Sequence, residues 1–178
     1  MRAGVVAFFI VFLAGLPGAR AADSIEYQLK AAFLYRFAQF TEWPAAALAS
    51  REQLTLCVLG EDPFGPALDG LAGNPVQQRR LAVQRLSDPQ QLGHCHIVFL
   101  GAMRPEVLSQ VLRRSRQLPV LTVADHKGFA AAGGMIQFVI VNNRVQFEIN
   151  SAAAERAGLK LSSHLLKLAR TLYTSYPD

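Results

Sequence analysis

The segment Leu54-Thr-Leu-Cys-Val-Leu-Gly60 decides the fold class, because it is short, almost wholly apolar and flanked by polar residues. A run of this kind is typical of a strand that is covered on both faces of a sheet. Two similar runs follow it, His96-Ile-Val-Phe-Leu100 and Pro119-Val-Leu-Thr-Val-Ala124. Strands buried on both faces occur in parallel sheets flanked by helices, so these runs predict an α/β protein.

Helical segments are expected between these strands. Asp62-Pro63 provides an N-cap and a first-turn proline for a helix to about Leu71, and residues 105–117 have an amphipathic helical pattern. Residues 80–86 alternate between apolar and polar, which predicts a strand with one wet face. This alternation of strands and helices indicates a parallel sheet with right-handed crossovers.

The pattern changes after Gly133-Gly134. Two β-type runs, residues 135–141 and 144–149, are joined by Asn142-Asn143 and predict a β-hairpin. A last helix is expected from the N-cap Ser162 to about Tyr173. We therefore predict one domain with a mixed, mostly parallel sheet, helices on both faces, and a C-terminal β-hairpin plus helix.

A long helix is expected over residues 24–42, before the first strand. Apolar residues recur there at three- and four-residue spacing and form one stripe: Ile25, Leu29, Phe33, Phe37 and Phe40. Trp43-Pro44 ends the helix, since a residue before proline avoids the helical region. Because the stripe is wide, we expect it to be covered as part of the core.

The first 21 residues have the pattern of a cleaved signal peptide. Arg2 precedes an apolar stretch, and Ala19 and Ala21 stand at the −3 and −1 positions of a signal-peptidase site. The alternative is a retained membrane anchor, but the stretch of about 14 residues is shorter than the roughly 20 that a spanning helix needs. We expect cleavage after Ala21 and export to the periplasm or beyond.

The composition excludes several classes of protein. Of the 178 residues 51% are apolar and 17% are charged, which excludes global disorder. Cleavage after Ala21 would remove Arg2 and Arg20, so the formal net charge would fall by two from +5. The densest basic patches, at Arg79-Arg80 and at Arg113-Arg114 with Arg116, are not interleaved with aromatic residues. We therefore expect no binding to nucleic acid.

Cys57 and Cys95 are the two cysteines of the chain. An even count in an oxidising compartment favours one intramolecular disulfide, and two buried free thiols are the alternative. A metal site at His94-Cys95-His96 is a weaker interpretation. In an extended segment His94 and His96 would point to one side and Cys95 to the other.

The chain carries no motif of a known catalytic site: it has no G-x-S-x-G, H-E-x-x-H, P-loop or C-x-x-C. The loop 60–65 lies where α/β proteins bind anions, but Glu61 and Asp62 would repel phosphate, which favours a plain strand-to-helix turn. Asp125-His126 follows a strand end, where catalytic residues occur. A catalytic triad would also need a nucleophilic serine, and no sequence motif identifies one. We expect no catalytic residue, no metal and no cofactor.

Seven blocks, in one order across nearly the whole mature chain, resemble the YfiR family of small periplasmic proteins. The blocks are Lys30-Ala-Ala-Phe-Leu-Tyr-Arg-Phe-Ala-Gln-Phe-Thr-Glu-Trp-Pro44, Leu56-Cys-Val-Leu-Gly-Glu-Asp-Pro-Phe-Gly65, Cys95-His-Ile-Val-Phe99, Leu121-Thr-Val-Ala-Asp125, Gly128-Phe-Ala-Ala-Ala-Gly-Gly-Met-Ile136, Arg144-Val-Gln-Phe-Glu-Ile-Asn150 and Gly158-Leu-Lys-Leu-Ser-Ser-His-Leu-Leu-Lys-Leu-Ala169. On this resemblance residues 1–21 are the signal peptide and residues 22–178 a YfiR-like α/β domain.

The resemblance implies a periplasmic repressor. Family members bind the periplasmic sensor domain of an inner-membrane diguanylate cyclase and thereby lower cyclic-di-GMP and biofilm formation. An outer-membrane lipoprotein is a second partner implied by the family, and a homodimer is a third possibility. The alternative function is a periplasmic binding module for a small ligand or another receptor.

One departure from the family concerns its cysteines. The best-known member has a cysteine pair at the positions of Cys57 and Cys95 and a second pair farther along, but residues 128–150 of this chain contain no cysteine. Redox sensing through a second disulfide is therefore excluded here. No contact residue carries over from the family. We expect the partner to bind residues 135–173, where the sheet turns antiparallel and an apolar edge can be exposed.

Overall fold

The computed structural model describes residues 18–49 and 52–175. The main sheet contains β2 (Gln53–Leu59), β3 (Pro75–Val76), β4 (Arg79–Leu86), β5 (Ile97–Leu100), β6 (Leu121–Ala124), β7 (Ile136–Val141), β8 (Arg144–Asn150) and β10 (Thr171–Tyr173). A small second sheet pairs β1 (Thr41–Glu42) with β9 (Lys160–Leu161). The helices are α1 (Gly18–Gln39), α2 (Ala45–Leu48), α3 (Pro66–Asp69), α4 (Pro105–Ser115), α5 (Ser151–Arg156) and α6 (Ser163–Leu168), with a 3₁₀ helix η1 at Pro89–His94.

The main sheet has the strand order β10-β8-β7-β6-β5-β2-β4-β3. Strands β4, β2, β5, β6 and β7 are parallel, whereas β8 is antiparallel to β7 and β3 is antiparallel to β4. Strand β10 returns parallel to β8. The predicted mixed, mostly parallel sheet is thus confirmed. Between β2 and β5 the strand order reverses: β4 and β3 are added on one side of β2, and the later strands are added on the other side.

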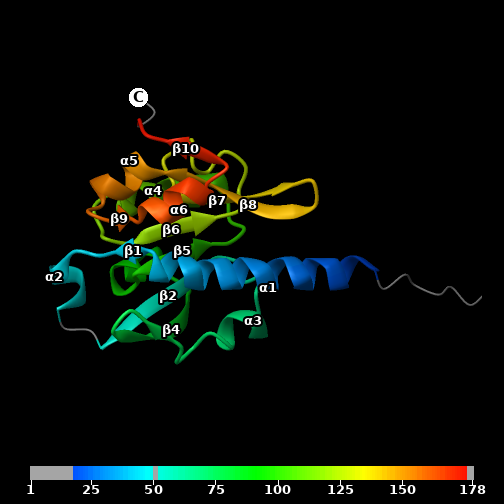
Figure 1. Cartoon of the computed structure of the whole chain (residues 1–178), viewed down its shortest axis with the longest axis horizontal. Helices are drawn as coiled ribbons and strands as arrows, with labels where there is room; N and C mark the ends of the chain where they lie inside the picture. Colours follow the sequence, from blue (N-terminus) through cyan, green and yellow to red (C-terminus); the bar gives the residue numbers. More distant parts are fainter. Residues whose placement is uncertain (1–17, 50–51, 176–178) are drawn as a thin grey trace, which may run out of the picture.

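Both faces of the sheet are covered, because alternate side chains of the central strands enter two separate cores. On one face Ile97 and Phe99 pack with residues of α1, among them the fully buried Phe37. On the other face Val98 and Leu100 pack against α4. Figure 1 shows α1 crossing one face of the molecule as its longest element.

The β7–β8 hairpin forms where the sequence predicts it. Asn142 and Asn143 have φ values of 49° and 59°, the left-handed conformation that a two-residue hairpin turn requires. Only Ile136 and Gln137 of β7 pair with β6, so the distal half of the hairpin continues beyond the neighbouring strand. In Figure 1 it projects from the sheet on the side toward the N-terminal end of α1.

Helix α1 differs from the predicted helix 24–42 at both ends. It begins at Gly18, so the last residues of the expected signal peptide form its first turn, while residues 1–17 lie outside the described part. It ends at Gln39, because Thr41 pairs with Leu161 across the small sheet and its hydroxyl donates to the Phe37 carbonyl at 2.7 Å. No helix in residues 18–49 and 52–175 is both long and apolar enough to span a membrane.

The expectation that the whole apolar stripe of α1 is covered is wrong for its N-terminal half. Phe37 is fully buried, but Ile25 is 67% exposed and Leu29 is 45% exposed. The physical reason is the extent of the sheet. The aromatic side chains of β7 and β8 underlie Phe37, whereas the projecting hairpin tip is the neighbour of Ile25 and Leu29.

The helix predicted from Pro63 to Leu71 is shortened to α3. Asp62 does act as a cap, since its carboxylate accepts a hydrogen bond from the Phe64 backbone at 2.8 Å, but the capped unit is a turn. Gly65 then adopts φ +50°, which interrupts the backbone before Pro66 starts the helix.

The last predicted helix, from Ser162 to Tyr173, divides into α6 and β10. Ser162 caps α6 as expected, with its hydroxyl accepting from the Leu165 backbone at 3.2 Å. After Leu168 the chain extends and pairs with β8. The buried carboxylate of Glu148 there accepts hydrogen bonds from three side chains: Arg170 at 2.8 Å, Thr171 at 3.3 Å and Tyr173 at 3.1 Å. The spacing of apolar residues within 162–173 cannot reveal that Glu148, more than 20 residues away in the sequence, is the hydrogen-bond partner that holds β10.

Candidate functional site

The crevice where parallel α/β sheets usually bind ligands is closed in this protein. That crevice lies at the carboxyl ends of the strands where the strand order reverses, here β2 and β5. The loops after these strands pack backbone to backbone. A Cβ on Gly101 would lie 1.9 Å from the Glu61 carbonyl, and the Glu61 backbone donates to Ala102 O at 3.4 Å. A ligand therefore has no room between these loops.

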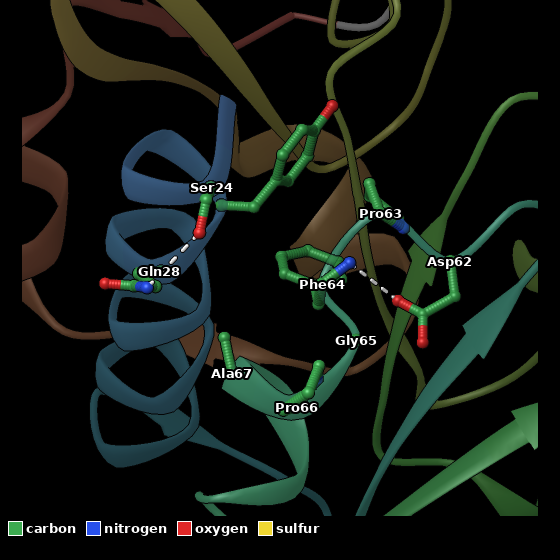
Figure 2. A pocket seen from close by; sticks show the side chains of 9 residues that line it. Ser24, Gln28, Asp62, Pro63, Phe64, Gly65, Pro66 and Ala67 are labelled. Carbon is green, nitrogen blue, oxygen red and sulfur yellow. Dashed lines mark hydrogen bonds between the residues drawn. The ribbon is translucent and has the colours of Figure 1, made fainter. Parts of the chain in front are cut away.

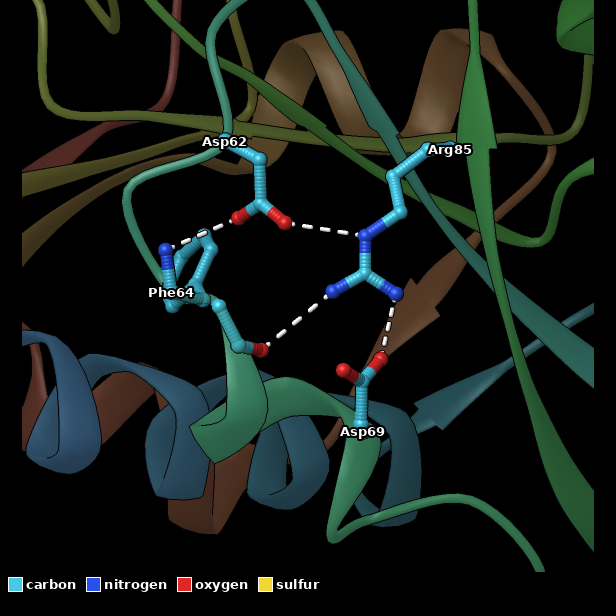
Figure 3. Close-up of polar contacts among 5 residues, drawn as sticks. Asp62, Phe64, Asp69 and Arg85 are labelled. Carbon is cyan, nitrogen blue, oxygen red and sulfur yellow. Dashed lines mark hydrogen bonds and ion pairs between the residues drawn. The ribbon is translucent and has the colours of Figure 1, made fainter.

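The loop 60–65, the candidate anion site, is held by Arg85 of β4 (Figure 3). The Arg85 guanidinium contacts Asp62 at 2.9 Å, Asp69 and the Gly65 carbonyl at 3.2 Å. Hydrogen bonds to Asp69 and Asp62 raise the pKa of Arg85. The strand-to-helix turn is thus an internally satisfied acidic loop, not a cradle for phosphate.

An open hollow of about 710 Å³ lies between α1 and the same loop (Figure 2). Its lining is largely apolar, with Tyr27, Phe64 and Pro66 among its walls. The polar side chains at its rim bond within the protein: Gln28 donates to Ser24 at 3.4 Å, and Asp62 is engaged as described above. The hollow therefore offers shape but few directed polar contacts.

Asp125, half of the Asp125-His126 pair, fixes α1 to the end of β6. Its carboxylate accepts from Lys30 at 2.7 Å and from the Tyr27 hydroxyl at 3.0 Å, and Lys30 also pairs with Glu26 at 2.7 Å. The Lys30 side chain is only 3% exposed. Burial acts to lower the pKa of Lys30, but the hydrogen bonds to Asp125 and Glu26 outweigh it and raise the pKa.

The same cluster affects Tyr27. Burial, followed by the charge of Asp125, raises the pKa of Tyr27. The second residue of the pair, His126, places Nε2 3.0 Å from the Gly101 carbonyl. Both members of the pair therefore contact neighbouring elements, and the arrangement is that of a structural clamp.

The two cysteines form a disulfide, Cys57–Cys95, in agreement with the pairing that the sequence favours. Their Cα atoms are 5.9 Å apart, and both residues are buried on the α4 face of the sheet. His96 accepts a hydrogen bond on Nδ1 from the Thr55 backbone at 2.9 Å and packs edge-on against Trp43. With Cys95 in the disulfide, the sequence His94-Cys95-His96 lacks the thiolate that a metal would need. The described residues include no group of three or more ligands suited to a metal ion.

We define the inner hollow as the depression of about 400 Å³ between the C-terminal half of α1, β8 and α6. Its residues are Phe33, Arg36, Phe37, Phe40, Phe147, His164, Leu165 and Leu168. The floor is aromatic: the Phe37 and Phe147 rings are 5.1 Å apart, and Phe33 lies 5.6 Å from Phe147. Leu168 is 58% exposed at the rim, and Arg36 is the charged side chain beside it. This arrangement can hold an apolar side chain with an acidic neighbour.

We define the outer hollow as the depression of about 650 Å³ between the N-terminal half of α1 and the hairpin tip. Its residues are Ile25, Glu26, Leu29, Ile140, Asn143, Arg144 and Val145. Ile140 is 48% exposed, which adds to the exposed Ile25 and Leu29. The two hollows lie along one side of α1 and carry the exposed apolar side chains Ile25, Leu29, Ile140 and Leu168.

The expected contact surface, residues 135–173, contributes three of the large exposed apolar side chains: Ile140, Leu168 and Leu172. The part of this surface that α1 contributes was not predicted from the sequence. Ile25 and Leu29 belong to a stripe that reads as core, and no sequence signal distinguishes its covered half from its exposed half.

Comparison with known proteins gives a family and remote structural neighbours. The family model described as YfiR/HmsC-like matches residues 27–170. A crystal structure of a conserved domain protein from Vibrio cholerae O1 biovar El Tor aligns with a TM-score of 0.48 and 7% sequence identity. The alignment covers 82% of this chain and 60% of that one.

Proposed function

The chain belongs to the YfiR/HmsC-like family, and on that premise we propose that it binds and represses the periplasmic sensor domain of an inner-membrane diguanylate cyclase. The match over residues 27–170 is the observation that carries the proposal. The match includes most of α1, every strand of the main sheet except β10, and α6, so it takes in the elements that form the inner hollow. The outcome of repression would be less cyclic-di-GMP and less biofilm.

We place the contact with the cyclase at the inner hollow. Exposed apolar patches rimmed by polar groups are typical of surfaces that bind proteins, and a few central apolar residues provide most of the binding free energy. Leu168 fits that role because it is 58% exposed beside an aromatic floor. Arg36 favours a partner that has an acidic residue next to its apolar anchor.

Repression on this proposal requires binding alone. A protein that binds only the inactive conformation of the sensor domain shifts the population of the cyclase toward that conformation, without any chemical step. The shift in the equilibrium between the two conformations can be no larger than the ratio of the repressor's affinities for them. A second partner, such as an outer-membrane lipoprotein, would relieve repression by competing for the same surface.

Export is part of the proposal. A periplasmic sensor domain can be reached only if the chain leaves the cytoplasm, and residues 1–21 have the composition of a cleaved signal. N-terminal sequencing of the protein recovered from the periplasm should begin at Ala22. A protein that keeps Met1 and remains in the membrane fraction would contradict this part.

The decisive experiment combines genetics with direct binding. Deletion of the gene should raise cellular cyclic-di-GMP, and deletion of the partner cyclase in the same strain should cancel the increase. The purified protein should bind the isolated sensor domain in a titration followed by calorimetry. Unchanged cyclic-di-GMP in the deletion strain would reject repression. A small molecule that co-purifies with the protein, in the absence of cyclase binding, would favour the alternative of a ligand-binding module.

A further inference from the structure

We propose that the α4 face of the protein binds a phosphate monoester, at a polar depression that is separate from both hollows beside α1. We define the α4 depression as the open space of about 620 Å³ between η1 and the C-terminal half of α4. Its residues are Asp88, Pro89, Gln90, Gln110, Arg113, Arg114 and Gln117. Helix α4 packs on the sheet face opposite α1, so a ligand bound here leaves the α1 face open for the cyclase.

One face of α4 supplies most of the polar groups of this depression. The four lining residues between positions 110 and 117 are spaced by three and four residues, so their side chains are neighbours on the helix surface. The other face of α4 holds the apolar residues that pack on the sheet, among them the buried Val111 and Leu112. Two of the four polar side chains are amides and two are guanidinium groups, so all of them donate hydrogen bonds. Gln90 adds a third amide from η1.

The positive charge of the α4 depression is not compensated within the helix. On a solvated helix face, cations are commonly paired with carboxylates three or four residues away. Here glutamines stand at that spacing, with Gln110 four residues before Arg114 and Gln117 four residues after Arg113, and residues 107–117 contain no acidic residue. Among residues 18–49 and 52–175, Arg113 has no hydrogen-bond or ion-pair partner. Its guanidinium group is therefore available to an anion from outside the chain.

The second guanidinium group, that of Arg114, is held in position by η1. It donates to the Gln90 carbonyl at 3.2 Å, which fixes it across the space between the two helices. Arginines in a last helical turn also complement the helix dipole, but the hydrogen bond that Arg114 makes is to η1. A guanidinium group that is already ordered loses less side-chain entropy when a ligand binds.

The balance of charges and donors favours a phosphate monoester. The carboxylate among the lining residues, Asp88, accepts from the Gln90 backbone at 2.8 Å and so caps η1, and the two guanidinium groups outnumber it. Five donor side chains line the depression, which exceeds the roughly four acceptor sites of a carboxylate, whereas a phosphate monoester offers three oxygens that match guanidinium groups. None of the lining residues is aromatic, so the depression would not stack a nucleotide base. The phosphate therefore belongs to a small soluble ester or to a lipid headgroup.

The test measures how the purified exported protein binds two sources of phosphate monoester. Glycerol 3-phosphate, titrated by calorimetry, represents a soluble ester. Vesicles that contain phosphatidic acid, compared with phosphatidylcholine vesicles in a flotation assay, represent a lipid headgroup. We expect binding to at least one of these probes, with a dissociation constant raised about tenfold or more in Arg113→Gln, because charge-assisted hydrogen bonds are lost. The melting temperature of Arg113→Gln should equal that of the wild type, since no contact within the protein is removed.

Arg104→Gln is the matched control. Arg104 is an exposed arginine at the other end of α4 that does not line the depression, so the variant removes the same charge and should bind like the wild type. Binding of glycerol 3-phosphate would support a soluble ester as the ligand, and binding of phosphatidic acid vesicles alone would support a headgroup. Binding to neither probe, wild-type binding by Arg113→Gln, or equal losses in Arg104→Gln and Arg113→Gln would overturn the proposal.

Discussion

The two halves of α1 carry one apolar stripe but have opposite surroundings. Phe37 is fully buried, with the Phe138 and Phe147 rings at 5.6 Å and 5.1 Å. Ile25, about three turns earlier on the same stripe, is 67% exposed beside the hairpin tip. The difference shows that periodicity determines which side of a helix is apolar, whereas the extent of the sheet beneath determines whether that side is core or binding surface.

The strongest test of this comparison substitutes one residue in each half. Phe37→Ala should lower the free energy of unfolding by about 3–5 kcal/mol, because it leaves a cavity among packed aromatic rings. Ile25→Ala should change it by no more than about 0.5 kcal/mol, as is usual for an exposed position. Urea denaturation of both variants measures the contrast. Equal losses in the two variants would show that α1 is uniformly packed.

The contrast also explains how much of the fold could be predicted from the sequence. The continuously apolar runs identify β2, β5 and β6, and Asn142-Asn143 identifies the hairpin turn, because these signals are local. Strand β10 could not be predicted. Its residues fit a helical spacing, and only the distant Glu148 provides the hydrogen bonds that fix it as a strand.

A second prediction separates the two faces of the sheet. Cys57 and Cys95 lie on the α4 face, away from α1, and the disulfide closes a segment with a sequence separation of 38. Replacing both cysteines by alanine should lower the free energy of unfolding by about 2–4 kcal/mol. Because both hollows lie on the opposite face, cyclase binding under conditions where the variant is folded should be unchanged.

Mass spectrometry of the non-reduced wild type is the control for this prediction, and it should show no free thiol. A variant that is fully folded but has lost cyclase binding would indicate that the disulfide influences the α1 face after all.

A third prediction concerns the clamp that holds the N-terminal half of α1. Lys30→Met removes the ammonium group from Glu26 and Asp125, and we expect a loss of about 1–3 kcal/mol, since both carboxylates remain partly accessible to water. The raised pKa of Lys30 contributes stability that is lost as the pH rises above its ordinary value of about 10.4.

Tyr27 acts in the same direction, because its raised pKa means that the unfolded chain releases the proton first in alkali. Unfolding free energies measured from neutral to strongly alkaline pH should therefore fall for the wild type, and fall less steeply for Lys30→Met. Identical pH profiles would contradict the role assigned to the clamp.

The candidate site was harder to predict than the fold. The range 135–173 does contain Leu168 and Ile140, but α1 supplies one wall of each hollow, and its contribution depends on where the helix overhangs the sheet. From the sequence, Arg36 is recognisable only as a charged residue between the apolar residues of the helix, and its role at the hollow cannot be predicted. Its place beside Phe147 and Leu168 follows from the packing of α1, β8 and α6 together.

The last prediction has the smallest expected effect on stability, and it tests the inner hollow directly. Leu168→Arg changes a side chain that is 58% exposed, so the free energy of unfolding should stay within about 0.5 kcal/mol of the wild type. The added positive charge beside Arg36 should repel the acidic partner surface that we propose, and cyclic-di-GMP should rise to the level of the deletion strain. Lys167→Ala is the matched control, because Lys167 is exposed on the same helix but does not line the hollow. If Leu168→Arg represses as well as Lys167→Ala at equal protein levels, the cyclase must bind elsewhere, and the exposure of Leu168 would need a different explanation.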